Sequence, residues 1–390
     1  MSVITDDNYH TVVRKLITSN EKVPKGTNLQ NLPAKGAGVR VRNCFIPRKG
    51  FTFIGADLGQ IQPRIMAHIM YVKYGDNSMR QIFVDGVDLY TKMAMMTFGL
   101  PEQVCLDKAW YDPVSGQGGF GGEPPATAYY PRKMMKTGQL AVSYDQSPRA
   151  FAKKMNVTED VAHMFFENFD ETFPSFKPMV KDYREMMKRD GYVETLFGRK
   201  RRFPDFNEVA AFVKRNEQRL YRLYSERKRL QNITNPRDAD RKRLTAVQDE
   251  IDILSAKRGL VGYWIRAAFN AVIQGTGADI LKLIGIRNAA VCRERGWEMN
   301  ASIHDEIKNS IPNDQFTAET IDLINEIMMK TVELSVPLVT DTVIEPCWMQ
   351  TYKPEEWDFA GCRPIIEKYD EKGRVYDDYD ERLQAAKGVA

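Results

Sequence analysis

The sequence contains few cysteines and few histidines, which limits the metal and redox chemistry it can support. Its 390 residues include five cysteines, none in a Cys-x-x-Cys pair, and four scattered histidines. Structural zinc sites usually draw on closely spaced cysteines and histidines, so we expect none here. Separated cysteines favour reduced thiols and a cytoplasmic location.

The sequence also lacks a long hydrophobic run and a strong charge of one sign. No stretch of 18 apolar residues could cross a membrane, and the acidic first seven residues do not resemble a signal peptide. Basic residues (56) barely exceed acidic ones (52), so overall charge does not identify a partner. A 43% hydrophobic share fits a globular chain of roughly two or three structural units without membrane association.

Hydrophobic periodicity divides much of the chain into predicted strands and helices. A strand over residues 51–58 ends in Asp57, and two short strands flank the stretch 304–306. Frequent glycine and proline predict a long loop within 102–130, and residues 360–390 are typical of a loosely held polar tail. Helices are predicted over a short N-terminal stretch within 1–27 and over 61–72, 88–98, 132–144 and 262–290.

Residues 207–258 stand out by their charge and their apolar spacing. The segment holds 13 basic and 8 acidic residues and is interrupted by Asn235 and Pro236, a turn signal. Apolar residues recur at coiled-coil spacing on both arms, which predicts an antiparallel helical hairpin. The hairpin could be a solvated decoration, a clamp on nucleic-acid phosphates or a docking arm for a partner.

Two acidic positions suit a pair of divalent metal ions. Asp57 ends a strand, and Asp305 and Glu306 lie in a tight turn between strands. Carboxylates at the ends of neighbouring strands can hold two cations about 4 Å apart for in-line phosphoryl displacement. Oxygen ligands of this kind suit Mg²⁺, which completes its coordination with substrate phosphates. Taken alone, each aspartate is more often a turn residue or a helix cap.

The predicted helix over 132–144 carries functional residue types at steps of four, along one face. Arg132 and Lys136 could meet the phosphates of a nucleoside triphosphate, Leu140 its sugar or base, and Tyr144 the pairing base. A solvated amphipathic helix would show the same pattern.

The predicted helix over 262–290 repeats this arrangement with Arg266, Asn270 and Gln274. These side chains can donate hydrogen bonds to base edges in a minor groove, where the acceptor pattern hardly depends on sequence. Ordinary polarity of a helix surface is the alternative.

Seven segments, taken together and in order, resemble the polymerase region of family A DNA polymerases, the bacterial DNA polymerase I group. The resemblance implies an α+β fold, a right hand with an antiparallel palm sheet and helical fingers, and DNA-directed DNA polymerase activity. The segments are NLQNLP (28–33), GADLGQIQPRIMAHI (55–69), DLYTKMAMMTFGLP (88–101), RKMMKTGQLAVSYDQS (132–147), TLFGRKRRFPD (195–205), RAAFNAVIQGTGADILKL (266–283) and IHDEI (303–307).

The resemblance implies a role for each matching residue. Asp57 and Asp305 would bind two Mg²⁺ ions, or Mn²⁺, with Glu306 assisting. Arg132 and Lys136 would hold the deoxynucleoside triphosphate, and Lys136 could protonate the departing pyrophosphate. The residues implied to contact primer–template DNA are Arg266, Asn270, Gln274, Arg199, Arg64 and His304. Arg64 could instead have a structural role, and His304 could instead orient its turn.

Two departures from the family pattern bear on the choice of sugar. Gln62 stands where family members usually carry Glu, and Leu140 replaces the usual Phe or Tyr beneath the sugar. Gln is nearly isosteric with Glu, so crowding of the 2′ position can persist without the charge. Sugar selectivity therefore stays open, while the metal ligands, the phosphate-binding cations and Tyr144 are intact, so we expect activity.

The resemblance also implies a domain layout. Residues 28–75 would begin the palm, 76–190 form the fingers, and 191–206 with 259–359 complete the palm around the 207–258 hairpin. The family signature begins at residue 28, so we expect little or no thumb and no exonuclease domain. A separate thumb, exonuclease or processivity subunit could supply the missing grip, as in a reduced phage-type or split polymerase. The rivals are a non-catalytic polymerase-like DNA-binding or replisome subunit and a single-subunit RNA polymerase.

Overall fold

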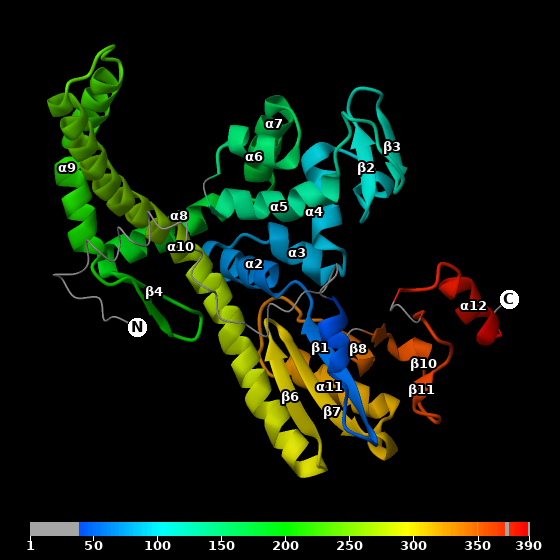
Figure 1. Ribbon diagram of the computed structural model, residues 1–390. Helices are drawn as coiled ribbons and strands as arrows, with labels where there is room; N and C mark the ends of the chain where they lie inside the picture. Colours follow the sequence, from blue (N-terminus) through cyan, green and yellow to red (C-terminus); the bar gives the residue numbers. More distant parts are fainter. Residues whose placement is uncertain (1–38, 145, 349, 371–373, 389–390) are drawn as a thin grey trace. The chain divides into compact units, whose positions relative to one another are not determined.

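The computed structural model describes residues 39–144, 146–348, 350–370 and 374–388, drawn in colour in Figure 1. The chain forms two compact units. The first comprises residues up to Gly55, Cys292–Ile321 and the chain from Thr342 onward, and the second comprises Ala56–Val291 and Asp322–Asp341. Short 3₁₀ turns lie at Val39–Cys44, Glu102–Cys105, Asn313–Gln315 and Pro354–Glu356.

A five-stranded sheet forms the centre of the first unit. Its strands are β6 (Glu298–Ile303), β7 (Glu306–Pro312), β1 (Phe51–Leu58), β8 (Thr340–Cys347) and β9 (Gln350–Tyr352), in that spatial order. The pairs β6–β7 and β8–β9 are antiparallel. Five successive residues of β7 are buried, as in a strand covered on both faces. The last three residues of β1 and the first two of β8 are counted with the second unit.

Helices dominate the second unit, and their ends follow ordinary capping rules. Asp88, Ser147 and Thr158 each accept a backbone N–H at a helix start, whereas Gly75 and Gly191 end helices in the left-handed conformation. The helices before the hairpin are α2 (Ile61–Tyr74), α3 (Ser78–Val84), α4 (Leu89–Phe98), α5 (Pro131–Ser143), α6 (Pro148–Met155), α7 (Glu159–Thr172) and α8 (Phe176–Asp190).

A chain of phenylalanines holds α6, α7 and α8 together. Phe151, Phe165, Phe169, Phe173 and Phe176 are almost fully buried, and neighbouring rings lie 5.0–5.7 Å apart in stacked, tilted and edge-on arrangements. Aromatic pairs at this separation add to the stabilisation from burial itself. This core supports α5, because Gly138 of α5 packs directly on the ring of Phe165.

The prediction of a long loop within 102–130 is wrong in part. Residues Ala109–Asp112 (β2) and Gln117–Phe120 (β3) form an antiparallel hairpin. The buried Asp112 fixes its turn by accepting hydrogen bonds from Ser115 and Thr127. Glycine-rich β3 lacks the apolar alternation that announces a strand, so the sequence pattern missed it. A second small hairpin pairs β4 (Tyr192–Glu194) with β5 (Lys200–Arg202).

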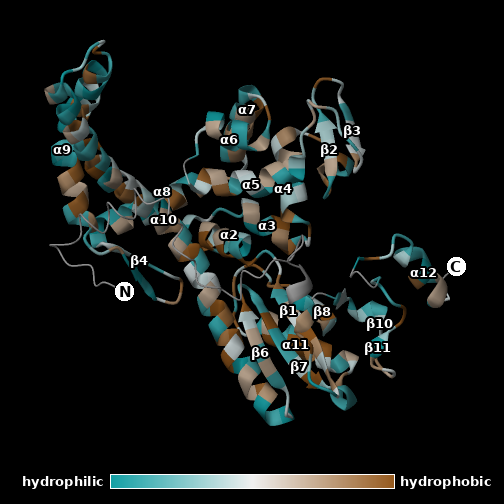
Figure 2. Ribbon diagram, viewed as in Figure 1, coloured by the Kyte–Doolittle hydropathy of each residue, from teal (hydrophilic) through white to brown (hydrophobic). Residues whose placement is uncertain are grey.

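The predicted helical hairpin is present, but its second arm is longer than expected. Helix α9 (Phe206–Gln231) lies beside α10 (Asp238–Arg295), with Leu220, Leu223 and Val247 in their shared core. We expected the arm to end near 258 and a separate helix over 262–290. Instead α10 is continuous for 58 residues, because Gly259 and Gly262 cost it only about 1 kcal/mol each and no proline interrupts it. Hydrophobic and hydrophilic residues alternate along both helices in Figure 2.

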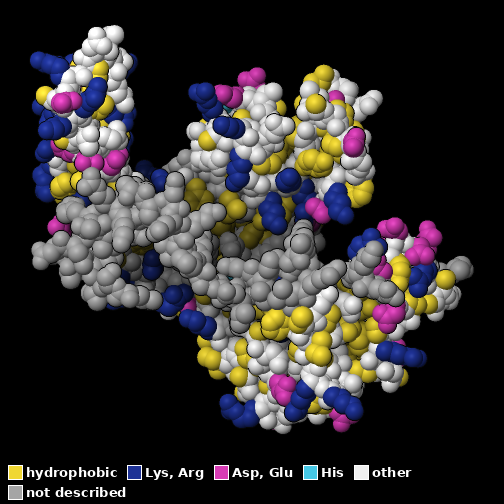
Figure 3. All heavy atoms as spheres, in the orientation of Figure 1, with side chains coloured by type: hydrophobic (Ala, Val, Ile, Leu, Met, Phe, Trp, Pro, Cys, Tyr) yellow, Lys and Arg dark blue, Asp and Glu magenta, His cyan; other side chains and the backbone are white. Residues whose placement is uncertain are grey.

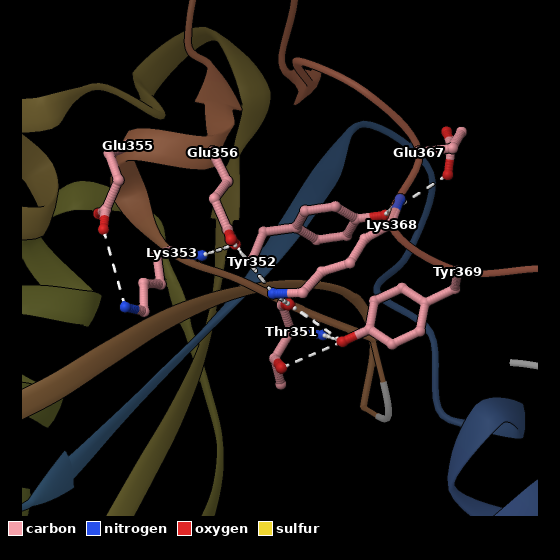
Figure 4. Close-up of polar contacts among 8 residues, drawn as sticks. All are labelled: Thr351, Tyr352, Lys353, Glu355, Glu356, Glu367, Lys368 and Tyr369. Atoms are coloured by element: carbon pink, nitrogen blue, oxygen red, sulfur yellow. Dashed lines mark hydrogen bonds and ion pairs between the residues drawn. The ribbon is translucent and has the colours of Figure 1, made fainter. Parts of the chain in front are cut away.

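The C-terminal segment is held more firmly than the loosely held tail we expected. Lys368 Nζ donates to both carboxylate oxygens of Glu356 at 3.0 and 3.3 Å and to the carbonyl of Thr351. The Tyr369 hydroxyl accepts from the Thr351 amide, so two stretches of chain are tied together (Figure 4). Strands β10 (Trp357–Asp358) and β11 (Arg363–Pro364) and helix α12 (Tyr379–Ala386) complete this region.

The α+β class with antiparallel pairing and a helical hairpin confirms the predicted fold class. The N-terminal helix expected within 1–27 and the NLQNLP segment lie outside the described residues. Among the described residues, no helix combines the length and apolar character that crossing a membrane requires. The division into palm and fingers by residue number stays a prediction.

Candidate nucleotide and nucleic-acid site

Helix α5 presents the predicted nucleotide-binding residues on its exposed side. Lys136 is exposed, as are Leu140 (42%) and Tyr144 (40%), which directly follows the helix. The opposite side buries Met134, Gly138 and neighbouring small residues against the rest of the unit. An apolar side chain and an aromatic ring in line on an exposed helix face mark a surface available to a ligand.

Arg132, unlike Lys136, is already bound to carboxylates of the same unit. Its Nε and Nη2 donate to the two carboxylate oxygens of Asp88 at 3.0 Å each, and its Nη1 donates to Asp107 Oδ1 at 3.1 Å. Burial opposes ionisation of Asp88, but the Arg132 guanidinium and the Thr91 amide outweigh it and hold the pKa of Asp88 at about 2. Arg132 is therefore committed to a bidentate ion pair, and an anion would have to share or displace that pair.

A basic cleft of about 460 Å³ lies in the second unit beside α10. It is lined by Tyr144 at the end of α5 and by Arg266, Asn270 and Gln274 of α10. The four residues predicted at template and primer positions therefore share one cleft. The lining includes three arginines and two tyrosines and no carboxylate, a composition that attracts phosphates and offers rings to bases. The remaining lining residues are Thr195, Arg199, Arg201, Tyr263, Ala267, Ala271, Gly275 and Ala278.

Asn270 has an unpaired donor within this cleft. The residue is only 5% exposed, and its Nδ2 has no hydrogen-bond partner among the described residues. A buried amide left unpaired costs about 1–3 kcal/mol, so such a group requires an explanation. Because this Nδ2 is itself buried, a ligand acceptor could supply one only if the Asn270 side chain turned toward the cleft. Nearby, Arg199 is fixed by Asp279 Oδ1 at 2.6 Å and by the Gly275 carbonyl at 2.8 Å.

Asp57 is the second-last residue of β1 and belongs to the second unit. Its side chain is half-buried, and its backbone carbonyl accepts a hydrogen bond from Thr340 Oγ1 at 2.9 Å. Two residues earlier, Gly55 of the first unit leaves no room for a side chain, because a Cβ there would lie 2.6 Å from Glu306 Oε1. The glycine of the predicted motif thus lets β1 approach a carboxylate of the His304–Glu306 turn closely.

Asp305 lies in the two-residue turn that joins β6 to β7 in the first unit. His304 precedes it with φ of +56°, a left-handed conformation that non-glycine residues seldom adopt. Glu306 opens β7 and is held by Lys308 Nζ at 2.7 Å, and Lys308 also contacts Glu345 Oε2 at 2.5 Å. The turn therefore has a fixed, slightly strained backbone and one anchored carboxylate.

Arg64 and Gln62 differ in what they can contact. Arg64 is buried, and its guanidinium donates to the carbonyls of Gly59 and Pro337 and lies over the Phe83 ring. Burial lowers the pKa of Arg64 to about 10. This arrangement favours the structural role for Arg64 over a DNA contact. Gln62, two residues earlier on α2, is half-buried.

The structure brings some predicted residues together within one unit and divides others. The template-side residues share the second-unit cleft, while Asp57 belongs to the second unit and Asp305 with Glu306 to the first. Within the described residues, no group of three His, Cys, Asp or Glu side chains could hold a metal ion by itself. Sequence reasoning missed Tyr263, a lone exposed ring without a motif, and Lys308, whose burial no local pattern announces.

A family model described as DNA polymerase family A matches residues 2–109 and 120–350 of the chain. Among curated relatives, the thermostable DNA polymerase I of Thermus filiformis is 25% identical over 343 residues, covering 87% of this chain and 32% of its own length. DNA polymerase I of Deinococcus radiodurans is 28% identical over 325 residues, or 83% and 26% of the two chains. The chain thus spans about a third of the length of such relatives or less. Whether a thumb, a nuclease region or a separate subunit completes its grip stays a prediction.

A solved structure shows a similar fold. It is described as the POL domain of Pol1 from M. smegmatis in complex with DNA primer-template and dNTP. The likeness has a TM-score of 0.58 at 23% identity, and it covers 83% of this chain and 44% of that one. The fold predicted from the sequence motifs, that of a family A polymerase region, is therefore confirmed.

Proposed function

The chain belongs to DNA polymerase family A, and from this premise we propose that it is a template-directed DNA polymerase. It adds deoxynucleotides to a primer 3′ end. The observation that carries the proposal is the basic cleft, where Tyr144 of α5 and Arg266, Asn270 and Gln274 of α10 line one space. The solved relative binds primer–template DNA and a dNTP, which supports the same ligands here.

The cleft suits the minor-groove side of a primer terminus. Arg266 and Gln274 are exposed at its wall and can donate to base-edge acceptors, and the buried, unpaired Nδ2 of Asn270 could join them by turning toward the cleft. Acceptors in the minor groove are present on every base pair, so these donors can hold correctly paired ends of any sequence. Tyr144, exposed beside them, offers its ring to the pair being formed.

The exposed face of α5 suits the incoming triphosphate. Lys136 forms no ion pair with any described residue, so its ammonium is available to the phosphates. We assign it the proton that the departing pyrophosphate takes up. Arg132 also binds the phosphates, by giving up some of its hydrogen bonds to the Asp88 carboxylate and donating to phosphate oxygens instead. Both acceptors can bind a guanidinium through two oxygens. Nucleotide binding and the Asp88 pair therefore compete.

Asp57 and Asp305 are the proposed metal-binding carboxylates. Their oxygens fit Mg²⁺, and Mn²⁺ also accepts such donors. Two divalent ions held there would polarise the reacting oxygens and neutralise charge that develops on the phosphates. Glu306 assists from a position that Lys308 fixes.

The chemistry transfers a nucleotidyl group. The primer 3′ hydroxyl releases its proton to water as its oxygen bonds to the α-phosphorus of the deoxynucleoside triphosphate. The bond from that phosphorus to the oxygen bridging to the β-phosphate breaks, and pyrophosphate leaves. His304, exposed in its left-handed turn, positions the primer end next to Asp305. We place Gln62 and Leu140 beside the sugar, and the comparison of deoxy- and ribonucleotides in the extension assay decides the sugar selectivity that they give.

Extension of a labelled primer–template by the chain in Mg²⁺ tests the proposal. We expect extension with deoxynucleotides and none by the Asp57→Asn variant. Asp238→Asn removes the same charge from an exposed position on α10 and should extend normally. Primer–template binding without extension would instead support a non-catalytic replisome subunit. Preferential use of ribonucleotides would support an RNA polymerase.

A further inference from the structure

Helix α9 carries a wide face of positive charge. Five cations lie within a sector of about 140°, counted at 100° per residue, and no Asp or Glu falls inside it. The sector points away from the shared core of α9 and α10, and all five side chains are exposed. Figure 3 shows basic side chains over this hairpin. We call this face the α9 basic face; its cations are Lys214, Arg215, Arg222, Lys228 and Arg229.

The cations of the α9 basic face lack close ion-pair partners among the described residues. Hydrogen bonds hold the pKa of Glu226 and of Asp240 below the usual range, and Arg229 lies near enough to both carboxyls to lower the pKa of each further. The arginines that pair across the hairpin lie elsewhere: Arg219 contacts Glu250, and Arg243 contacts Glu226 at 2.8 Å. Residues 206–231 hold seven basic and three acidic residues, whereas 236–258 hold six and five. The excess charge is thus concentrated on α9.

The face is rigid and is anchored close to the cleft. Phe206, at the start of α9, packs edge-on against Trp264, two residues before Arg266 of the cleft wall. Lys214 follows Phe206 by eight residues, a rise of about 12 Å. From Lys214 to Arg229 the face runs for a further 22 Å or so. Helix α10, against which α9 packs, runs unbroken from the hairpin to the cleft.

We propose that the α9 basic face binds the phosphate backbone of duplex DNA that extends from the cleft. This proposal depends on the proposed function in one respect, which is that primer–template DNA is the ligand of the cleft. Duplex DNA carries a charge every 1.7 Å of its axis, roughly, so a straight row of cations meets phosphates along its whole length. Arg215, Arg222 and Arg229 recur every seven residues, at intervals of about 10 Å on one line.

The shape of the face favours duplex DNA over a single strand. Sites for single strands combine a groove with several aromatic rings on which bases stack. The α9 basic face is the convex surface of one helix and holds a single ring, Tyr221, which is 55% exposed. It therefore offers charge without a stacking platform, which suits contacts to a backbone whose bases are already paired.

The salt dependence of DNA binding tests this proposal directly. Each phosphate contact adds about 0.9 to the slope of log Kd against log salt. The triple variant R215Q/R222Q/R229Q should therefore lower the slope by about 2.7 on a primer–template with 20 base pairs of duplex. Between 50 and 200 mM KCl, wild-type affinity should fall about 40-fold more than that of the variant. Fluorescence anisotropy without nucleotide or Mg²⁺ keeps chemistry out of the measurement.

A matched control separates phosphate contacts from net charge. The variant R237Q/R241Q/K242Q removes the same three charges from the α10 side of the hairpin and should leave the slope unchanged. Gln is a good helix former, so helical circular dichroism of both variants should match wild type. Equal slopes for wild type and the α9 variant would overturn the proposal and leave the face to an acidic protein. A loss confined to a single-stranded 30-mer would overturn the assignment to duplex.

The two proposals fail in different ways. If wild type fails to extend the primer but the α9 variant has a lower salt slope, the proposed polymerase activity is refuted and the proposed phosphate contact is supported. Normal extension with identical slopes would remove the phosphate contact and keep the polymerase.

Discussion

Replacing Lys308 with methionine should destabilise the first unit, and the loss should depend on pH. The Lys308 side chain is 6% exposed and contacts Glu306 and Glu345 at 2.7 and 2.5 Å. Glu345 is 3% exposed, and burial raises its pKa to about 7 even though the Lys308 ammonium lowers it. Methionine keeps the apolar length of the side chain but leaves two carboxylates without their cation.

The raised pKa of Glu345 determines whether stability rises or falls with pH. Below the ordinary value of 4.5, Glu345 is protonated in the folded and unfolded chains, and its contribution to stability is fully present. That contribution is lost as pH rises through about 7, at a cost of about 3 kcal/mol over the interval. Without Lys308 the folded pKa rises further, so the variant loses more than wild type above pH 7.

Two pH values make this measurable. At pH 8.5 an unpaired buried carboxylate should cost the variant about 3–5 kcal/mol. At pH 5, Glu345 is neutral in both folded proteins, and the loss should be about 1.5–3 kcal/mol, the value of a hydrogen bond between charged groups such as Lys308 and Glu306. Urea unfolding can be followed by tryptophan fluorescence, to which the first unit contributes Trp297, Trp348 and Trp357 and the second unit Trp110 and Trp264.

Two further variants complete the test. Glu345→Gln combined with Lys308→Met removes both charges and should recover most of the stability at pH 8.5. Lys353→Met changes an exposed lysine of the same unit and should have little effect at either pH. Equal losses for Lys308→Met at pH 5 and 8.5, or a double variant as unstable as the sum of the singles, would refute the reasoning.

Two other predictions concern the nucleotide face. A Cβ on Gly138 would overlap the Phe165 ring, so Gly138→Ala should lower the free energy of unfolding by about 1–3 kcal/mol and weaken nucleotide binding by shifting α5. The control Gly259→Ala places its Cβ in open space on α10 and should leave the protein equally stable or more stable in thermal melting. Asp88→Asn keeps the helix cap but weakens the ion pair with Arg132 that competes with the nucleotide. The Kd for a deoxynucleotide, measured by fluorescence quenching, should therefore fall severalfold. A higher Kd would show instead that Asp88 positions Arg132 for binding.

Much of the fold was visible in the sequence because its signals are local. The apolar run of 51–58 gave β1, and the apolar spacing of 244–254 gave an arm of the helical hairpin. The β2–β3 hairpin was missed because its second strand is mostly glycine and polar, and because Asp112 fixes it through contacts with Ser115 and Thr127.

The shared face of three candidate site residues was predictable from spacing, whereas the pairing of others was not, and the roles of all of them stay predictions. Steps of four placed Arg266, Asn270 and Gln274 on one face, and the cleft confirms that they lie together. No spacing rule could show that Arg132 is bound to Asp88, 44 residues away, or that Lys308 lies between two carboxylates. Such contacts depend on how distant elements pack, which the tertiary fold alone determines.

Single-nucleotide incorporation tests the central claim most directly. The chain would be given a primer–template with each of the four template bases in turn and each of the four deoxynucleotides singly, in Mg²⁺. The account predicts efficient addition only of the complementary nucleotide, and none by Asp57→Asn or Asp305→Asn. Addition that ignores the template base, or that survives both substitutions, would contradict it.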